Sequence, residues 1–192
     1  MRIGALKVYG LAAVLAGLAC LPFVSGLKPK APARALLNSM LMRAAKGDAG
    51  AQLQLGVMYE TGSGVTRNYA YSAHWYRQAA EQGSAEAQSF LGLMYEEGRG
   101  VPRDHAEAVR WFRQAAEQGY TNAQSMLGIM YYERQDAPRD YVEAYMWTSL
   151  GASRASGDDR KKAAELLDRL ATIMTPEQIA EAQRRAREWK PN

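Results

Sequence analysis

Apolar residues between positions 87 and 122 recur every three or four residues, in two separate stretches. They are Ala87, Phe90, Leu91, Met94 and Tyr95 in the first stretch, and Ala108, Trp111, Phe112, Ala115 and Ala116 in the second. This spacing places them on one face of an amphipathic helix. Gly98 follows the first stretch, where a glycine satisfies the last carbonyl groups of a helix, and Asp104 precedes the second as a typical N-cap. Residues 87–122 therefore predict a helical hairpin.

The same pattern returns with a period of 36 residues. Residues 51–86 and 87–122 agree at 20 of 36 aligned positions without a gap, and a third copy covers 123–157 and diverges towards its end. A period of this length indicates stacked supersecondary units. One hairpin cannot bury its apolar face alone, so neighbouring hairpins stabilise one another and build an extended surface. We therefore predict an all-α solenoid of stacked helical hairpins, suited to binding rather than to catalysis.

A glycine lies inside the first helix of every copy, at Gly56, Gly92 and Gly128. Glycine costs about 1 kcal/mol relative to alanine in the interior of a helix. We expect the missing side chain to allow a neighbouring helix to approach closely at each of these positions.

Shorter helical patterns flank the three copies. Residues 34–46 match the second helix of a repeat and predict a truncated leading copy, so that the repeat region covers 34–157. Residues 158–192 predict two capping helices. The second of these begins after Thr175, with proline at its first position and Gln178 placed for a capping box.

The N-terminus has the pattern of a targeting segment. Arg2 and Lys7 precede an uncharged and mostly apolar run over residues 8–24. This pattern predicts that residues 1–26 are a cleaved signal peptide or a retained membrane anchor, and Cys20 leaves a lipoprotein as a third reading. Residues 27–33, with two prolines, form a stiff linker. All three readings place the repeats outside the cytoplasm, in the periplasm or secreted, or anchored to the inner membrane and facing outwards.

Charge and candidate chemistry exclude several function classes. The net charge is +4, but residues 1–50 carry +6 and residues 51–157 carry −3, so the basic balance belongs to the N-terminal segment and no nucleic-acid partner is expected. With Cys20 as the single cysteine, no disulfide can form within one chain. His74 and His105 occupy different repeat positions, and the G-x-G runs at Gly62 and Gly98 follow a helix rather than a strand. We therefore expect no catalytic residue, no cofactor and no metal site.

The repeated residues resemble the Sel-one-like repeat (SLR) family, a relative of the tetratricopeptide repeat. The shared pattern is A-x3-L-G-x2-Y-x2-G-x-G-V, a capping residue, and then A-x4-W-x3-A-A-x2-G. The second copy carries it at Ala87, Leu91, Gly92, Tyr95, Gly98, Gly100, Val101, Asp104, Ala106, Trp111, Ala115, Ala116 and Gly119. The first copy matches at the positions 36 residues earlier, from Ala51 to Gly83. The third copy departs from the pattern at Arg134, Asp136, Val142, Gly151 and Ala155.

This resemblance implies a right-handed α-solenoid that serves as a scaffold for binding proteins or peptides, and bacterial members are often exported. Some cysteine-rich secreted relatives have been linked to penicillin binding and weak β-lactam hydrolysis, but the repeats of this chain contain no cysteine.

The resemblance also implies that the first helix of each hairpin lines a concave groove. The groove positions are Leu53, Val57 and Glu60 in the first copy, Ser89, Leu93, Glu96 and Glu97 in the second, and Ser125, Ile129, Tyr132 and Glu133 in the third. The glutamates would make the groove acidic, which predicts a protein or peptide partner with lysine or arginine; alternatively they form a solvated face.

We expect a non-catalytic scaffold of the cell envelope that binds a protein or peptide in this groove, with membrane contact only through residues 1–26. The alternatives are a secreted cell-wall protein that binds peptidoglycan or β-lactams, and a subunit that dimerises through an exposed end of the solenoid.

Overall fold

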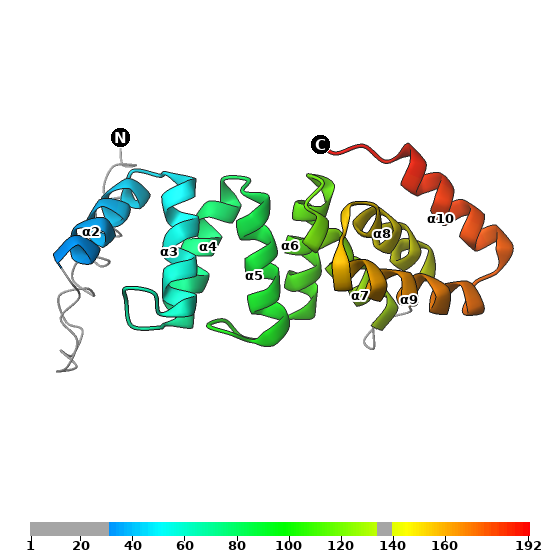
Figure 1. Ribbon diagram of the computed structural model, residues 1–192, viewed down its shortest axis with the longest axis horizontal. Helices are drawn as coiled ribbons and strands as arrows, with labels where there is room; N and C mark the ends of the chain where they lie inside the picture. Colours follow the sequence, from blue (N-terminus) through cyan, green and yellow to red (C-terminus); the bar gives the residue numbers. More distant parts are fainter. Residues whose placement is uncertain (1–30, 134–139) are drawn as a thin grey trace, which may run out of the picture.

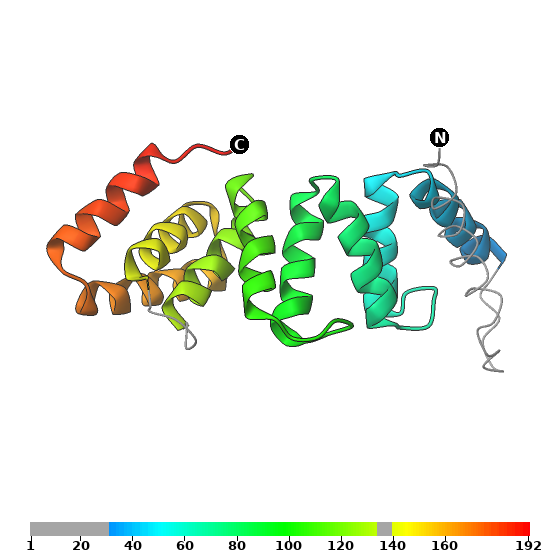
Figure 2. The ribbon, with the colours of Figure 1, turned by 180° about the vertical axis from the view of Figure 1, so that it is seen from behind.

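The computed structural model describes residues 31–133 and 140–192, and every regular element in these residues is an α-helix. The helices in chain order are α2 (Ala31–Ala45), α3 (Ala49–Thr61), α4 (Tyr69–Glu81), α5 (Ala85–Glu97), α6 (His105–Glu117), α7 (Thr121–Glu133), α8 (Tyr141–Arg154), α9 (Gly157–Ile173) and α10 (Pro176–Glu188). Figure 1 and Figure 2 show them stacked side by side in an elongated row. The predicted all-α solenoid of helical hairpins is confirmed.

Each repeat folds into one hairpin, α3 with α4, α5 with α6, and α7 with α8. The capping residues explain where the helices begin. Asn68 accepts hydrogen bonds from the backbone of Ala70 and Tyr71, and Asp104 does the same one repeat later. Gly62 and Gly98 end the first helices in the left-handed conformation.

Apolar stripes of successive helices form three core clusters that follow one another along the described part of the chain. The tryptophans that recur in the second helices, Trp75, Trp111 and Trp147, are only 4–6% exposed. The small residues that accompany them, such as Ala115 and Ala116, are fully buried. Because the apolar face of each hairpin lies against a neighbouring helix, these clusters are distributed along the row of repeats.

The glycines of the first helices do allow close approach, but not always by a helix backbone. A methyl group on Gly56 would lie 2.4 Å from the ring of Tyr76, and one on Gly92 would lie 3.1 Å from the ring of Phe112. Only at Gly128 does backbone come so near, 2.9 Å from the Thr148 nitrogen. The expectation of helix-to-helix approach is therefore right for the third repeat, whereas an aromatic ring fills the space in the first two.

Buried glutamines connect consecutive repeats. The Gln88 amide donates to the carbonyl oxygen of Ala80 in the preceding repeat over 3.1 Å. The side-chain oxygen of Gln88 accepts a bond of 2.8 Å from Gln118 of its own repeat. Gln52 and Gln82 make the equivalent bonds one repeat earlier. A buried amide that lost its partners would cost about 1–3 kcal/mol, so these bonds favour one relative position of neighbouring hairpins.

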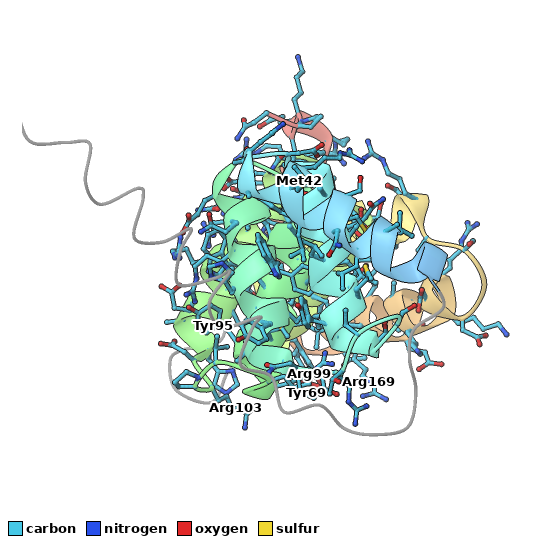
Figure 3. The ribbon with its side chains drawn as sticks, turned by 90° about the vertical axis from the view of Figure 1, so that its left-hand side faces the viewer. Met42, Tyr69, Tyr95, Arg99, Arg103 and Arg169 are labelled. Atoms are coloured by element: carbon cyan, nitrogen blue, oxygen red, sulfur yellow. The ribbon has the colours of Figure 1, made fainter. Side chains whose placement is uncertain are left out.

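The two ends of the solenoid differ. At the N-terminal end α2 packs on α3, and its Met42 is 65% exposed (Figure 3). At the C-terminal end the predicted capping box of α10 is present at Thr175 and Gln178. However, α10 packs against α8, where Trp189 meets the ring of Trp147 edge-on at 6.2 Å.

No helix within the described residues is long and apolar enough to cross a membrane. The predicted targeting segment, residues 1–26, and residues 27–30 of the predicted linker lie outside the described residues, so they stay predictions. Residues 31–33, which were also predicted to be linker, belong to α2 instead.

Candidate peptide-binding groove

A hollow of about 690 Å³ lies at the C-terminal half of the solenoid. Its walls come from the first helices of the second and third repeats, α5 and α7, and from α9, which runs across the direction of α3–α6 in Figure 1. The lining residues are Ser89, Phe90 and Leu93 from α5, Tyr120, Thr121, Asn122, Ser125, Met126, Ile129, Tyr132 and Glu133 in and before α7, Thr148 and Arg154 from α8, Ala155 and Ser156, and Asp159, Lys162, Ala163, Glu165, Leu166 and Arg169 from α9. A space of this size is typical of ligand pockets.

Six of the eleven predicted groove residues lie together in this hollow: Ser89, Leu93, Ser125, Ile129, Tyr132 and Glu133. The other five, Leu53, Val57, Glu60, Glu96 and Glu97, are not among its lining residues. The sequence pattern thus found the helix faces of the second and third repeats that border the hollow. It missed the contribution of α9, because α9 departs from the repeat pattern.

The Glu60 carboxylate is paired with other residues of the same chain. It accepts a hydrogen bond of 2.7 Å from the Tyr76 hydroxyl. It also forms an ion pair of 2.9 Å with Arg99, which belongs to the next repeat. Burial, and then the bond to Glu60, raises the pKa of Tyr76 far above its ordinary value, so the phenol remains a neutral donor. Figure 3 shows Arg99 beside Tyr69, and the guanidinium lies 5.5 Å from the centre of that ring.

The two glutamates at the end of α5 are also paired. Glu96 lies 2.7 Å from Nδ1 of His105 and 3.4 Å from Arg103, while Glu97 forms an ion pair with Arg99. Together with Glu60, all three carboxylates therefore have cationic or hydrogen-bonding partners within the chain. A basic partner would have to compete with these pairs, and the predicted lysine or arginine of the partner stays a prediction.

The lining of the hollow contains apolar side chains and equal numbers of acidic and basic residues. Its charged lining residues are Glu133, Asp159, Glu165, Arg154, Lys162 and Arg169, three acidic and three basic. Leu93, Ile129 and Leu166, which are partly buried, supply apolar surface. This lining suits a segment with apolar side chains and little net charge.

One position of the repeat register changes its residue type beside the hollow. Tyr76, Phe112 and Thr148 are 36 residues apart. The ring of Tyr76 covers Gly56 and stacks on Phe90 with ring centres 5.0 Å apart, and the ring of Phe112 is fully buried over Gly92. The third repeat has a threonine in place of the ring, and this threonine lines the hollow. The aligned column of tyrosine, phenylalanine and threonine is the signal from which the position could have been found.

No group of three or more histidine, cysteine, aspartate or glutamate side chains that could hold a metal ion occurs in the part of the chain that the structure describes. His105 pairs with Glu96, and His74 contacts the ring of Trp75 in the first repeat. The two histidines are thus engaged separately, in different hairpins.

The fold and the groove define an α-solenoid repeat protein with a concave hollow near its C-terminal end. The model of the Sel1 repeat matches residues 49–84, 85–120 and 121–156, more than half of the chain. The chain therefore belongs to the Sel1 repeat family. The three ranges begin at the first residues of α3, α5 and α7, and each contains one hairpin.

Two solved structures illustrate the similarity. A Sel1 repeat protein from Oxalobacter formigenes is 34% identical, with a TM-score of 0.59 over 67% of this chain and 97% of that protein. A protective antigen present in uropathogenic Escherichia coli strains, which displays an SLR fold, is 25% identical, with a TM-score of 0.58 over 95% of this chain and 44% of that protein. Among curated proteins, none matches this chain. Sel1 repeat proteins are generally non-catalytic scaffolds for protein–protein interaction.

Proposed function

We propose that this protein is a non-catalytic scaffold that binds an extended segment of a partner protein in its concave groove. The observation that carries this proposal is the hollow, where six residues predicted from the repeat register meet α9. Pockets lined mainly by apolar side chains with a few polar groups are the usual sites of specific binding. Leu53, which is half-buried, and Val57, which is 37% exposed, are apolar side chains of α3, and we propose that the groove extends to them.

A peptide-display selection tests this function. We expect a library of random peptides to yield binders of the full chain, and Ile129→Glu to weaken them about tenfold or more, because an apolar contact at the centre of an interface is replaced by a desolvated charge. The matched control is Ile173→Glu, since Ile173 is 49% exposed on α9 and does not line the hollow. Affinities would be measured by titration calorimetry. Equal binding by both variants would exclude the hollow as the binding site.

We further propose that the scaffold acts in the cell envelope, in the periplasm or anchored to the inner membrane. The support is the basic start and apolar run of residues 1–26. Alkaline phosphatase fused after residue 33 is expected to be active in a bacterial host, because the enzyme needs disulfides that form outside the cytoplasm. The same fusion without residues 1–26 serves as the control and should be inactive. Release of the fusion on opening the periplasm would indicate cleavage, and retention in membranes an anchor; activity without residues 1–26 would contradict export.

A further inference from the structure

We propose that α2 lies on an anionic membrane surface, so that the solenoid stands on the membrane through its N-terminal end. The sequence pattern alone predicts membrane contact only through residues 1–26. The contact through α2 is additional to that one, and it is separate from peptide binding in the hollow.

The most exposed large apolar side chains of the described residues lie on α2. Met42 is 65% exposed and Leu36 is 56% exposed, whereas Ile173, the next in order, is 49% exposed. Leu36, Ser39, Met42 and Lys46 are three or four residues apart, so they share one face of the helix, and all four are exposed. Other apolar side chains of α2 pack into the core cluster of the first repeat. The outward face of α2 therefore presents apolar surface to the surroundings of the protein.

The same part of the chain is basic. Residues 27–46 contain five lysine or arginine residues and no acidic residue. Arg43 forms an ion pair of 2.7 Å with Asp48, while Lys46 has no ion-pair partner among the described residues. Anionic headgroups attract lysine and arginine, and apolar side chains enter the boundary between headgroups and acyl chains. A second copy of the chain fits this face less well, because pairing α2 with α2 would bring like charges together.

The position of α2 in the stack suits such a contact. Among the described helices, α3 is the one on which α2 packs extensively. Figure 3 views this end of the solenoid, where α2 lies in front and carries Met42. In Figure 1, α7 and α9, which line the hollow, lie towards the opposite end of the row. A bilayer against α2 would therefore leave the hollow free for a partner protein.

The last helix does not combine these properties. On α10 the charged side chains pair with one another, since Glu181 accepts ion pairs of 2.8 Å from Arg184 and 2.7 Å from Arg185. None of the exposed large apolar residues in the described part of the chain belongs to α10. Charges of alternating sign along a helix are typical of a surface that faces water. Of the first and last described helices, α2 is thus the one suited to lipid.

Depth measurements with a spin label on the full chain test this contact. The label is attached to Ser39→Cys in a Cys20→Ser background, and its collisions with oxygen and with a polar nickel complex are compared. In vesicles that contain phosphatidylglycerol, we expect the label to be shielded from nickel and reached by oxygen. In vesicles of phosphatidylcholine alone, it should stay accessible to nickel because the charge attraction is lost. A label on Ser153→Cys, at an exposed position of α8, is the control and should be accessible to nickel in both.

Three surface variants separate the contributions of apolar contact and charge. Met42→Glu is expected to lower the ratio of surface-bound to free label about tenfold or more, because a charge replaces an apolar side chain at the headgroup boundary. Lys46→Gln should lower the same ratio about fivefold, the effect of one basic residue near an anionic surface. Ile173→Glu, at an exposed apolar position of α9, is the matched control and should leave the ratio unchanged.

Several results would overturn the proposal. These are equal nickel accessibility at positions 39 and 153, equal shielding with both lipids, and unchanged shielding in Met42→Glu. Shielding of position 39 without vesicles would also overturn it, since residues 1–30 would then cover α2, or a second copy if the shielding grows with protein concentration. The vesicle measurement does not depend on export. An inactive phosphatase fusion together with a shielded position 39 would therefore refute the proposed location and leave the contact of α2 standing.

Discussion

Replacing Gly100 by alanine is expected to destabilise the protein by about 4 kcal/mol, a cost that only a few mechanisms produce. Gly100 has a φ of +73°, which favours glycine, and a methyl group there would lie 2.1 Å from the carbonyl oxygen and 2.3 Å from the carbonyl carbon of Tyr69. Tyr69 begins α4 of the preceding repeat. Because both colliding groups are backbone, the loop of the second repeat would have to move away from the first.

Gly64 provides the matched control for this change. It occupies the same register position one repeat earlier and has a φ of +76°, but a methyl group there would meet only the end of Met58, at 3.5 Å. Gly64→Ala should therefore cost only the left-handed conformation, about 1–2 kcal/mol. Urea unfolding followed by circular dichroism and tryptophan fluorescence would compare the two variants. Similar losses for Gly64→Ala and Gly100→Ala would show that the contact between repeats is unimportant.

The helices could be predicted from the sequence because every hairpin solves the same packing problem. The capping residues Asn68 and Asp104, the buried tryptophans and the boundaries of the repeats all recur at one period, so each copy supports the interpretation of the others. The capping box before α10 could be predicted for a different reason. It depends on Thr175 and Gln178 alone, which are close in sequence.

The partners of the groove glutamates could not be predicted in this way. Arg99 reaches Glu60 across 39 positions of the chain, and the periodicity does not reveal such a contact, because the aligned residue in the first copy is Ser63. The packing of α10 on α8 was missed for a similar reason, since α9 and α10 depart from the repeated pattern. Thr148 and α9 line the hollow, and neither follows the repeated pattern, so the periodicity alone does not predict it.

The aligned column of Tyr76, Phe112 and Thr148 yields the second large effect. Replacing Phe112 by threonine, the residue that the third repeat carries at this position, is expected to destabilise the protein by about 3–5 kcal/mol. Phe112 is fully buried, and its ring lies 3.1 Å from where a methyl group on Gly92 would be. Removing the ring takes away its burial and leaves a cavity, because the neighbouring helices can relax only in part.

Thr148→Val is the counterpart in the third repeat and should be neutral or slightly stabilising. The hydroxyl that it removes is buried without a partner, and replacing such a group by an apolar group of the same shape relieves a cost instead of breaking a bond. The two variants are compared by urea unfolding at the same protein concentration. A loss below about 1 kcal/mol for Phe112→Thr would mean that the ring is not a structural element of the stack.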